Sequence, residues 1–218
     1  IVNHNFLCLF SLIRNLALSL LTIYLQVICR GCPHRSVREE PFAAISVDVK
    51  NKKDLVESLE AFVRGDLLEG DNAYYCDECG TKVDALKRVC VKALPHTLVI
   101  HLKRFDFDYE TMQRLKLKDR FEFPTYIDMK PYTVEGLTLR EMQNPSPRGN
   151  NDTYLNAGQK PDSVSDLFKP DAYYQYDLVG VVVHSGTAFA GHYYSYIKQR
   201  PGDHPLSCGH GQTGGYFI

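Results

Sequence analysis

The stretch from Tyr176 to Ile197, YDLVGVVVHSGTAFAGHYYSYI, decides how the surrounding chain folds. Its first part, Tyr176–His184, is rich in β-branched residues, and its last part, Tyr193–Ile197, again has the composition of a strand. Between them Ser185–Gly191 holds two glycines and two alanines, which is typical of a turn. The stretch therefore predicts a β-hairpin with a long loop, and His192 stands at the start of its second strand.

His192 is a candidate general base, because histidine as a residue type titrates near neutral pH. Gly191, directly before it, has no Cβ, so another chain could approach the imidazole closely. The alternative is a structural histidine held by its own neighbours. From the residues alone both interpretations stay open, because a single histidine is a weak motif.

Length and composition exclude some classes of protein. With 218 residues, 44% of them hydrophobic, the chain is long enough to bury a core as one domain or as part of a larger one. The net charge is -1, so nucleic-acid binding through bulk electrostatics is not expected. The first residue is Ile1, and the sequence is therefore expected to be a fragment.

Seven cysteines, an odd number, include two Cys-x-x-Cys pairs and three single residues. This usage fits a reducing compartment better than a disulfide framework. We therefore expect a cytoplasmic protein, with the nucleus as the alternative.

The first 28 residues form an apolar segment of uncertain origin. Phe6–Ile28 is interrupted by Arg14, Asn15 and Gln26. A charge in the middle of a membrane helix costs roughly 3 kcal/mol, so a membrane span is not favoured. An amphipathic core helix is expected instead. A third interpretation is that residues 1–28 are not native coding sequence.

Residues 29–128 have the pattern of a globular domain. Helical spacing over Lys52–Arg64 predicts a helix, with Asn51 as the better cap and Gly65 as its end. Strand patterns cover three segments: Phe42–Val49, Lys82–Lys92 and His96–Phe105. The last two are separated at Pro95, which lacks an amide donor.

Two later segments lack such a pattern. Glu141–Pro170 is dominated by Pro, Asn, Gly, Ser and Asp, and we expect a flexible insertion between two strands of one domain. Residues 199–218 form a glycine-rich, unpatterned tail.

The two Cys-x-x-Cys pairs comprise Cys29, Cys32, Cys76 and Cys79. Four cysteine ligands are typical of a structural zinc site, which leaves no open coordination position for catalysis. Forming such a site contributes roughly 10 to 16 kcal/mol of folding free energy. A redox Cys-x-x-Cys, or two unrelated pairs of free thiols, remain as alternatives. His34 is a spare possible ligand, and Cys90 is expected to be a buried apolar residue.

Many positions of the opening stretch occur in the same order in the histidine box of one enzyme family: Tyr176, Leu178, Gly180, Val181, His184, Gly186, Gly191, His192, Tyr193 and Tyr194. On these residues the chain resembles the ubiquitin-specific proteases (peptidase C19), which are cysteine-type deubiquitinases, and in particular their large fat-facets-type members. The cysteine pairs, with Phe42 and Tyr75, look like the zinc-binding fingers of that family. Residues 94–95, 99–105 and 121–124 look like its palm strands.

The resemblance implies an α+β fold. On this resemblance the chain would be the fingers-and-palm portion of a papain-like cysteine protease, with an antiparallel sheet, a four-cysteine zinc finger and the thumb largely missing. Residues 29–198 would be the partial protease domain, with 141–170 as its insertion. Residues 1–28 and 199–218 would lie outside it.

The resemblance also implies a reaction. Such proteases attack the isopeptide carbonyl after the terminal glycine of ubiquitin with a cysteine thiolate. His192 would be the general base and later the acid for the leaving lysine amine, and Gly191 and Tyr193 would bind substrate. The implied cofactor is structural Zn²⁺ at Cys29, Cys32, Cys76 and Cys79. The implied partners are ubiquitin and ubiquitinated proteins, while nucleic-acid and membrane partners are not expected.

The nucleophile of the family belongs to a Gly-Asn-Thr-Cys box at the start of a helix, and this sequence contains no such box. Cys8 lacks those neighbours, and Cys208 is in the tail. The orienting Asp or Asn is also missing, because Asp203 has no strand context. We therefore predict that the chain alone is inactive. The alternatives are a non-catalytic, zinc-stabilised ubiquitin-binding module and, less favoured, a generic zinc-ribbon interaction domain.

Overall fold

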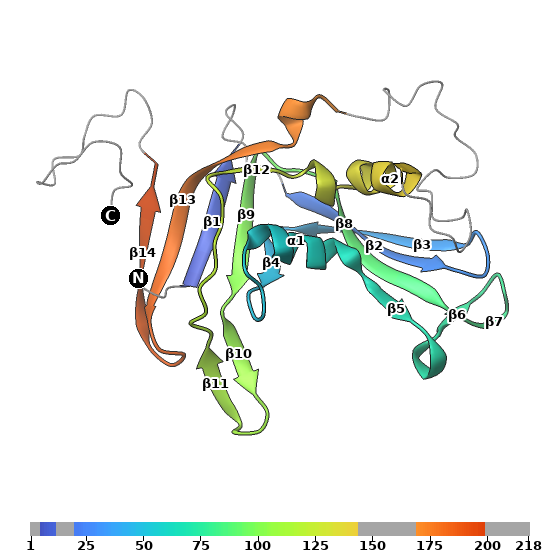
Figure 1. Cartoon of the computed structure of the whole chain (residues 1–218), viewed down its shortest axis with the longest axis horizontal. Helices are drawn as coiled ribbons and strands as arrows, with labels where there is room; N and C mark the ends of the chain where they lie inside the picture. Colours follow the sequence, from blue (N-terminus) through green and yellow to red (C-terminus); the bar gives the residue numbers. More distant parts are fainter. Residues whose placement is uncertain (1–4, 12–19, 144–168, 199–218) are drawn as a thin grey trace, which may run out of the picture.

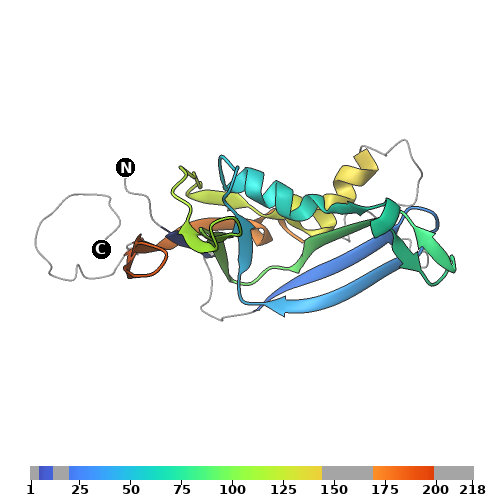
Figure 2. The ribbon, with the colours of Figure 1, turned by 90° about the horizontal axis from the view of Figure 1, so that it is seen from below.

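The computed structural model describes residues 5–11, 20–143 and 169–198, with backbone only for 5–11. Strands dominate it: a six-stranded sheet, a four-stranded sheet and two separate two-stranded sheets (Figure 1). Figure 2 shows that the molecule is elongated, because the two larger sheets lie end to end along its long axis. This is the sheet-rich α+β fold that the sequence predicted.

The six-stranded sheet has the order β12-β13-β1-β9-β4, and β14 also pairs with β13. All its pairs are antiparallel except β4 with β9, which is parallel, so the predicted antiparallel sheet is in fact mixed. Its strands are β1 (Asn5–Ser11), β4 (Ile45–Asp48), β9 (Thr97–Lys103), β12 (Tyr126–Asp128), β13 (Gln175–Gly186) and β14 (Gly191–Ile197).

The four-stranded sheet has the order β3-β2-β8-β5. Its strands are β2 (Leu21–Cys29), β3 (Arg35–Phe42), β5 (Asp66–Leu68) and β8 (Ala85–Ala93). At its outer end lies a small hairpin of β6 (Tyr74–Cys76) and β7 (Thr81–Val83) (Figure 1). A second hairpin, β10 (Phe105–Asp108) with β11 (Gln113–Lys116), projects from the six-stranded sheet.

Two α-helices, α1 (Leu55–Arg64) and α2 (Val134–Gln143), pack against β8. Figure 2 shows them on the same side of the four-stranded sheet. The apolar face of α1, formed by Leu55, Leu59 and Val63, is buried in the main core. Short 3-10 helices occur at η1 (Gly70–Asn72), η2 (Lys130–Tyr132) and η4 (Asp171–Tyr173).

The expectation of a helix over Phe6–Ile28 is wrong for the described part of that segment. Residues 5–11 and 21–29 are strands β1 and β2, and residues 12–19 lie outside the described residues. In β2, Leu21 and Ile23 are buried while Thr22 between them is less so, which is the period of a strand. Strand pairing with β3 and β8 outweighs the helical spacing of the leucines. Within the described residues, no helix is long and apolar enough to cross a membrane.

The helix cap was also predicted wrongly. Asp54, not Asn51, precedes α1, and its Oδ1 accepts a hydrogen bond from the backbone N–H of Glu57 at 2.9 Å. Asn51 adopts a positive φ of 59° in the preceding turn. The end of the helix at Gly65 is confirmed: φ there is 75°, and a Cβ would come 2.6 Å from the carbonyl oxygen of Lys87.

Other strand boundaries follow the prediction more closely. The break at Pro95 is confirmed, since β8 ends at Ala93 and β9 begins at Thr97. Predicted strand 82–92 is split between β7 and β8, and predicted strand 42–49 between the end of β3 and β4. Cys90 is fully buried as expected, and this burial raises the pKa of its thiol to about 12.

The hairpin predicted over Tyr176–Ile197 is confirmed as β13 and β14. Its loop is shorter than expected, because Gly186 pairs directly with Gly191 and only residues 187–190 turn. Gly186 has φ of 134°, which a residue with a Cβ rarely adopts. The predicted insertion 141–170, apart from the end of α2 and residues 169–170, and the tail 199–218 lie outside the described residues.

Candidate functional site

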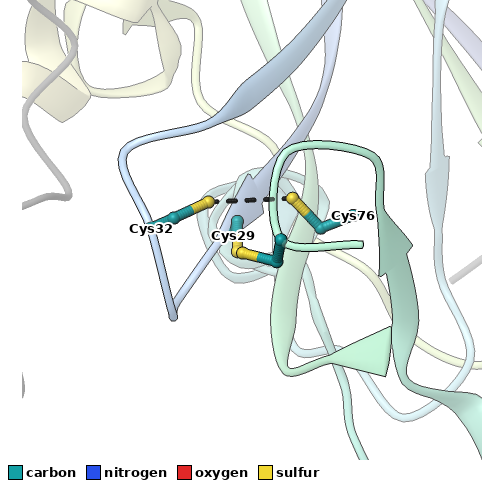
Figure 3. A group of neighbouring side chains, drawn as sticks. Cys29, Cys32 and Cys76 are labelled. Atoms are coloured by element: carbon teal, nitrogen blue, oxygen red, sulfur yellow. Dashed lines mark hydrogen bonds between the residues drawn. The ribbon is translucent and has the colours of Figure 1, made fainter. Parts of the chain in front are cut away.

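The four paired cysteines meet in one cluster at the outer end of the four-stranded sheet. Their sulfur atoms all lie within 4.8 Å of one another. The first pair begins at Cys29, the last residue of β2, and the second begins at Cys76, the last residue of β6, and lies in the turn before β7. Figure 3 shows Cys29, Cys32 and Cys76 pointing toward a common centre, with 3.7 Å between the sulfurs of Cys32 and Cys76. The two pairs are therefore not unrelated.

This geometry fits a tetrahedral zinc ion. With Zn–S bonds of about 2.3 Å, the sulfurs of a tetrahedral site lie about 3.8 Å apart, close to the distance between Cys32 and Cys76. The turns that carry the ligands are closed by backbone hydrogen bonds, from Gly80 to Cys76 at 2.9 Å and from Cys29 to His34 at 3.2 Å. These hydrogen bonds shape the two turns that bring the sulfurs together.

The protonation of the cluster points to a cation as well. Burial opposes ionisation of Cys76, but hydrogen bonds from the backbone of Cys79 and from His34 lower its pKa to about 6. The neighbouring thiol of Cys79 has its pKa raised to about 12, first by its hydrogen bond with Cys32 and then by burial. Burial also raises the pKa of Cys29. Ionisation of all four thiols would therefore need a nearby positive charge, which a bound Zn²⁺ would supply.

His34 is close to this cluster but is not one of the four ligands. Its Nδ1 lies 3.2 Å from the sulfur of Cys76, and its backbone N–H donates to the sulfur of Cys32 at 3.4 Å. These two contacts place His34 directly beside the sulfurs of Cys32 and Cys76.

A cleft of about 740 Å³ lies at the other end of the molecule, between the hairpin β10–β11 and the turn from β13 to β14. Both hairpins are at the lower left of Figure 1. The cleft is lined by Phe105, Asp106, Phe107, Arg114, His184, Thr187, Ala188, Phe189, Ala190, Gly191 and Tyr193. Two of the predicted site residues, Gly191 and Tyr193, are thus part of its wall.

Sequence reasoning missed the hairpin that forms the other wall. Its turn is closed by Asp108, whose carboxylate accepts from the backbone of Glu110 at 2.9 Å and from the hydroxyl of Thr111 at 2.7 Å. The signal was present as two alternating runs, Phe105–Asp108 and residues 114–117, on either side of this aspartate turn.

His192 is exposed on β14, opposite Ser185 of β13. Since successive side chains of a strand alternate between its faces, His192 points away from the face that carries Gly191 and Tyr193. Among the described residues, no carboxylate or amide is hydrogen-bonded to its imidazole.

No cysteine with a described side chain lies beside His192. Four of the five belong to the cluster at the opposite end of the molecule (Figure 1), and Cys90 is buried in β8. The side chains of Cys8 and Cys208 lie outside the described residues.

Gly191 is required by the packing of its own chain. A Cβ at this position would come 2.3 Å from the carbonyl oxygen of Ser185 and 2.4 Å from Nε2 of His184. The sequence suggested instead that the missing side chain leaves room for another chain. His184, to which the sequence analysis gave no role at the site, is buried under this glycine and lines the cleft.

Residues 20–204 match the family model described as ubiquitin carboxyl-terminal hydrolase. Ubiquitin carboxyl-terminal hydrolase 9Y of Mus musculus is 50% identical over 177 residues, which are 81% of this chain and 7% of that protein. Probable ubiquitin carboxyl-terminal hydrolase FAF of Drosophila melanogaster is 48% identical over 175 residues, 80% of this chain and 6% of that protein. Ubiquitin carboxyl-terminal hydrolase 24 of Homo sapiens is 43% identical over 187 residues, 86% of this chain and 7% of that protein.

Solved structures agree. The SAGA Ubp8/Sgf11/Sus1/Sgf73 DUB module bound to ubiquitin aldehyde has a TM-score of 0.58 and 30% identity, covering 82% of this chain and 33% of that chain. The SAGA DUB module with a variant of Ubp8, bound to monoubiquitin, has a TM-score of 0.58 and 32% identity, covering 81% of this chain and 32% of that chain. This chain thus spans a small part of its curated relatives and about a third of the solved chains. By this match over most of its length, the chain belongs to the ubiquitin carboxyl-terminal hydrolase family, among the ubiquitin-specific proteases with fat-facets-type relatives.

Proposed function

We propose that this chain is the fingers-and-palm part of a deubiquitinase that hydrolyses isopeptide bonds at the C-terminus of ubiquitin. The observation that carries the proposal is the hairpin β13–β14, which bears His192 and closes one side of the cleft, in a chain whose residues 20–204 match the family. Ubiquitin and ubiquitinated proteins are the proposed partners.

In this proposal His192 moves a proton twice. As general base it takes the proton of a cysteine thiol, and as general acid it gives that proton to the lysine amine that leaves. Its exposure on an edge strand gives the reacting groups access to the imidazole. The thiol would come from a part of the parent protein other than the residues that the structure describes.

The cleft would hold part of the extended C-terminal tail of ubiquitin, and the tail would pass Gly191 at the start of β14 to bring its last residue to His192 on the other face. Small residues line one wall, namely Thr187, Ala188, Ala190 and Gly191, and leave room for a peptide backbone. Tyr193, which is 69% exposed, would form part of the channel beside it. Asp106 and Arg114 on the opposite wall offer polar contacts.

We further propose that the four cysteines hold a structural zinc ion. Bound zinc supplies no chemistry to the reaction, because four protein ligands leave no coordination position for water or substrate. Its role is to fix β6–β7 against the end of β2, since the ligands come from both places.

The non-catalytic ubiquitin-binding module is the second candidate function. It is favoured by one observation, that no cysteine side chain among the described residues lies beside His192. It also agrees with the proposal that the 218-residue chain alone does not hydrolyse conjugates.

The cysteine usage supports a reducing compartment, and we propose the cytoplasm, with the nucleus as the alternative.

The test is a titration of fluorescently labelled ubiquitin with the purified chain, with and without a zinc chelator. Saturable binding that A188W weakens is the expected result, because an indole fills the cleft. V56W is the matched control, since it adds the same side chain to an exposed position on α1. Absence of binding by a chain that contains about one zinc ion per molecule would contradict the proposed function.

A further inference from the structure

Lys116, the last residue of β11, reaches across the end of the cleft to the last residues of β13. Its ammonium nitrogen lies 2.9 Å from the carbonyl oxygen of His184, 3.1 Å from that of Gly186, and 3.2 Å from Nδ1 of His184. An ammonium group has three donor hydrogens. All three therefore have an acceptor, and all three acceptors belong to the strand that leads into the cleft turn.

Lys116 is not an ordinary surface lysine. Burial lowers the pKa of its ammonium group, and the positive charges of Arg104 and Lys118 lower it further. Within the described part of the chain it forms no ion pair with a carboxylate. A half-buried cation without an opposite charge is unfavourable unless hydrogen bonds compensate, so the contacts with β13 are needed to keep it there.

His184 is held on several sides. Because an ammonium group only donates, Nδ1 accepts from Lys116 and the ring proton lies on Nε2. Nε2 faces Gly191, whose missing Cβ would otherwise lie 2.4 Å away. The ring of Phe105 packs edge-on at 5.3 Å, and that of Tyr193 is tilted at 4.8 Å. With 5% of its surface exposed, His184 is fixed in one orientation.

These contacts connect two elements that share no strand pairing. Strand β10 pairs with β11, whereas β13 pairs with β1, β12 and β14. Phe105 comes from one wall of the cleft and Tyr193 from the other, and His184 lies between them. The width of the cleft therefore depends on side-chain contacts at this point.

We propose that Lys116 and His184 are a positioning pair for the cleft. Lys116 orients the imidazole of His184, and His184 sets the separation of the two walls and the place of Gly191, which precedes His192. Neither residue is catalytic. The expected effect on binding rests on the proposed function of the cleft in binding ubiquitin. The orientation of His184 by Lys116 does not depend on that function.

The test compares K116M with K118M in the 218-residue chain. K116M keeps the length and apolar part of the side chain and removes its hydrogen-bond donors, while K118M removes an equal charge from an exposed neighbour. The first readout is the nitrogen NMR spectrum of histidine side chains, in which the His184 signal is identified by its loss in H184N. The second is the Kd for labelled ubiquitin.

In K116M the Nδ1 signal of His184 is expected to shift, and the Kd for ubiquitin to rise about tenfold, as for loss of a charged hydrogen bond. K118M should change neither. Two further variants guard against misfolding: H184N keeps an acceptor near the position of Nδ1, whereas H184L has similar size and no acceptor. Binding should be better retained in H184N than in H184L.

The outcomes separate the two proposals. If the wild-type chain does not bind ubiquitin, the proposed function fails, and the NMR comparison alone decides whether the pair exists. If the wild type binds and K116M binds equally well, the positioning role is wrong, whether or not the Nδ1 signal shifts. An unchanged Nδ1 signal in K116M, or equal binding by H184N and H184L, would also overturn it.

Discussion

At the scale of single residues, Gly191 shows how packing within the chain fixes a residue of the cleft wall. The backbone of Ser185 and the ring of His184 leave no room for a Cβ, so the chain itself demands glycine there. Gly191 also lines the cleft beside Tyr193. Packing within the chain thus selects glycine at a position of the cleft wall.

G191A is expected to destabilise the chain by about 2 kcal/mol, because the added methyl group overpacks a site bounded by backbone. It should also weaken ubiquitin binding, since either His184 or the β13–β14 turn must move. Chemical denaturation and ubiquitin titration measure the two effects. G70A is the control: its φ of +60° costs about 1 kcal/mol, but nothing lies within 4 Å of the new Cβ. Equal ubiquitin affinity in G191A and wild type would contradict the prediction.

At the scale of elements, side-chain contacts fix how helices and hairpins sit on the sheets. Arg140 of α2 forms a two-point ion pair with Glu60 of α1, at 2.7 and 2.9 Å. Nearby, the buried Arg88 of β8 donates to Glu141 of α2 at 2.6 Å and to Gln26 of β2 at 3.1 Å. The helices are thus joined to each other and to the four-stranded sheet.

The pair of Glu60 and Arg140 predicts a pH dependence. The hydrogen bond from Arg140 lowers the pKa of Glu60, against the effect of burial. A lowered folded-state pKa gives stability that is present above the unfolded value of about 4.3 and is lost as pH falls through the folded value. The free energy of unfolding of wild type minus that of E60Q should therefore be constant above about pH 5 and decline below about pH 4. Its size should be about 0.5 kcal/mol, as for partly exposed pairs.

Denaturation of wild type, E60Q, R140M and the double variant from about pH 3 to pH 7 checks this. The double-variant cycle isolates the pair from other acidic groups. A difference between wild type and E60Q that does not change over this range would show that the pair does not stabilise the contact between the helices.

The cysteine cluster gives a second prediction at this scale. Chelation of zinc should lower the melting temperature and disorder β6–β7, because this hairpin has only three-residue strands and the cluster joins it to β2. Amide hydrogen exchange should show the loss first over residues 74–83. C76S should reproduce the effect and be insensitive to the chelator. A chelator-resistant melting temperature in wild type would contradict the zinc site.

At the scale of the whole molecule, the sheet that carries the cleft is completed by a strand outside the family match. Strand β1 lies between β9 and β13, whereas the match begins at residue 20. Both neighbours of β1 thus lie within the matched residues 20–204. Strand β1 supplies hydrogen-bond partners for backbone groups along one edge of each of them.

Deletion of residues 1–19 is therefore expected to lower the melting temperature and to increase hydrogen exchange in β9 and β13 more than in β2 and β8. The physical reason is that two strand edges lose their partner at once. A truncated chain with the exchange pattern of wild type would show that β1 contributes nothing to the sheet.

The whole molecule also sets the expectation for catalysis. The five cysteines whose side chains are described lie in the cluster or in the core, away from His192, and we therefore expect the chain to release no fluorophore from a ubiquitin C-terminal fluorogenic substrate. H192A serves as the control for a contaminating enzyme. Hydrolysis by the wild-type chain that H192A abolishes would disprove the prediction.

The sequence by itself determined the hairpin of β13 and β14, the end of α1 at Gly65, the break at Pro95 and the two cysteine pairs as candidates for one zinc site, which the structure then brings together. These features follow from local rules: β-branched runs, glycine where φ is positive, a missing amide donor, and paired thiols. Asp54 was missed as the cap because Asn51 obeys the same local preference, and only the positive φ of Asn51 excludes it.

Only the tertiary structure decided what depends on partners distant in sequence. Phe6–Ile28 resembles a helix in isolation, but its described parts are strands because β8, β9 and β13 offer them backbone partners. Likewise, Lys116 and His184 are 68 residues apart in the sequence, so no local pattern connects them. Their contact arises because two hairpins from different parts of the chain converge on one cleft.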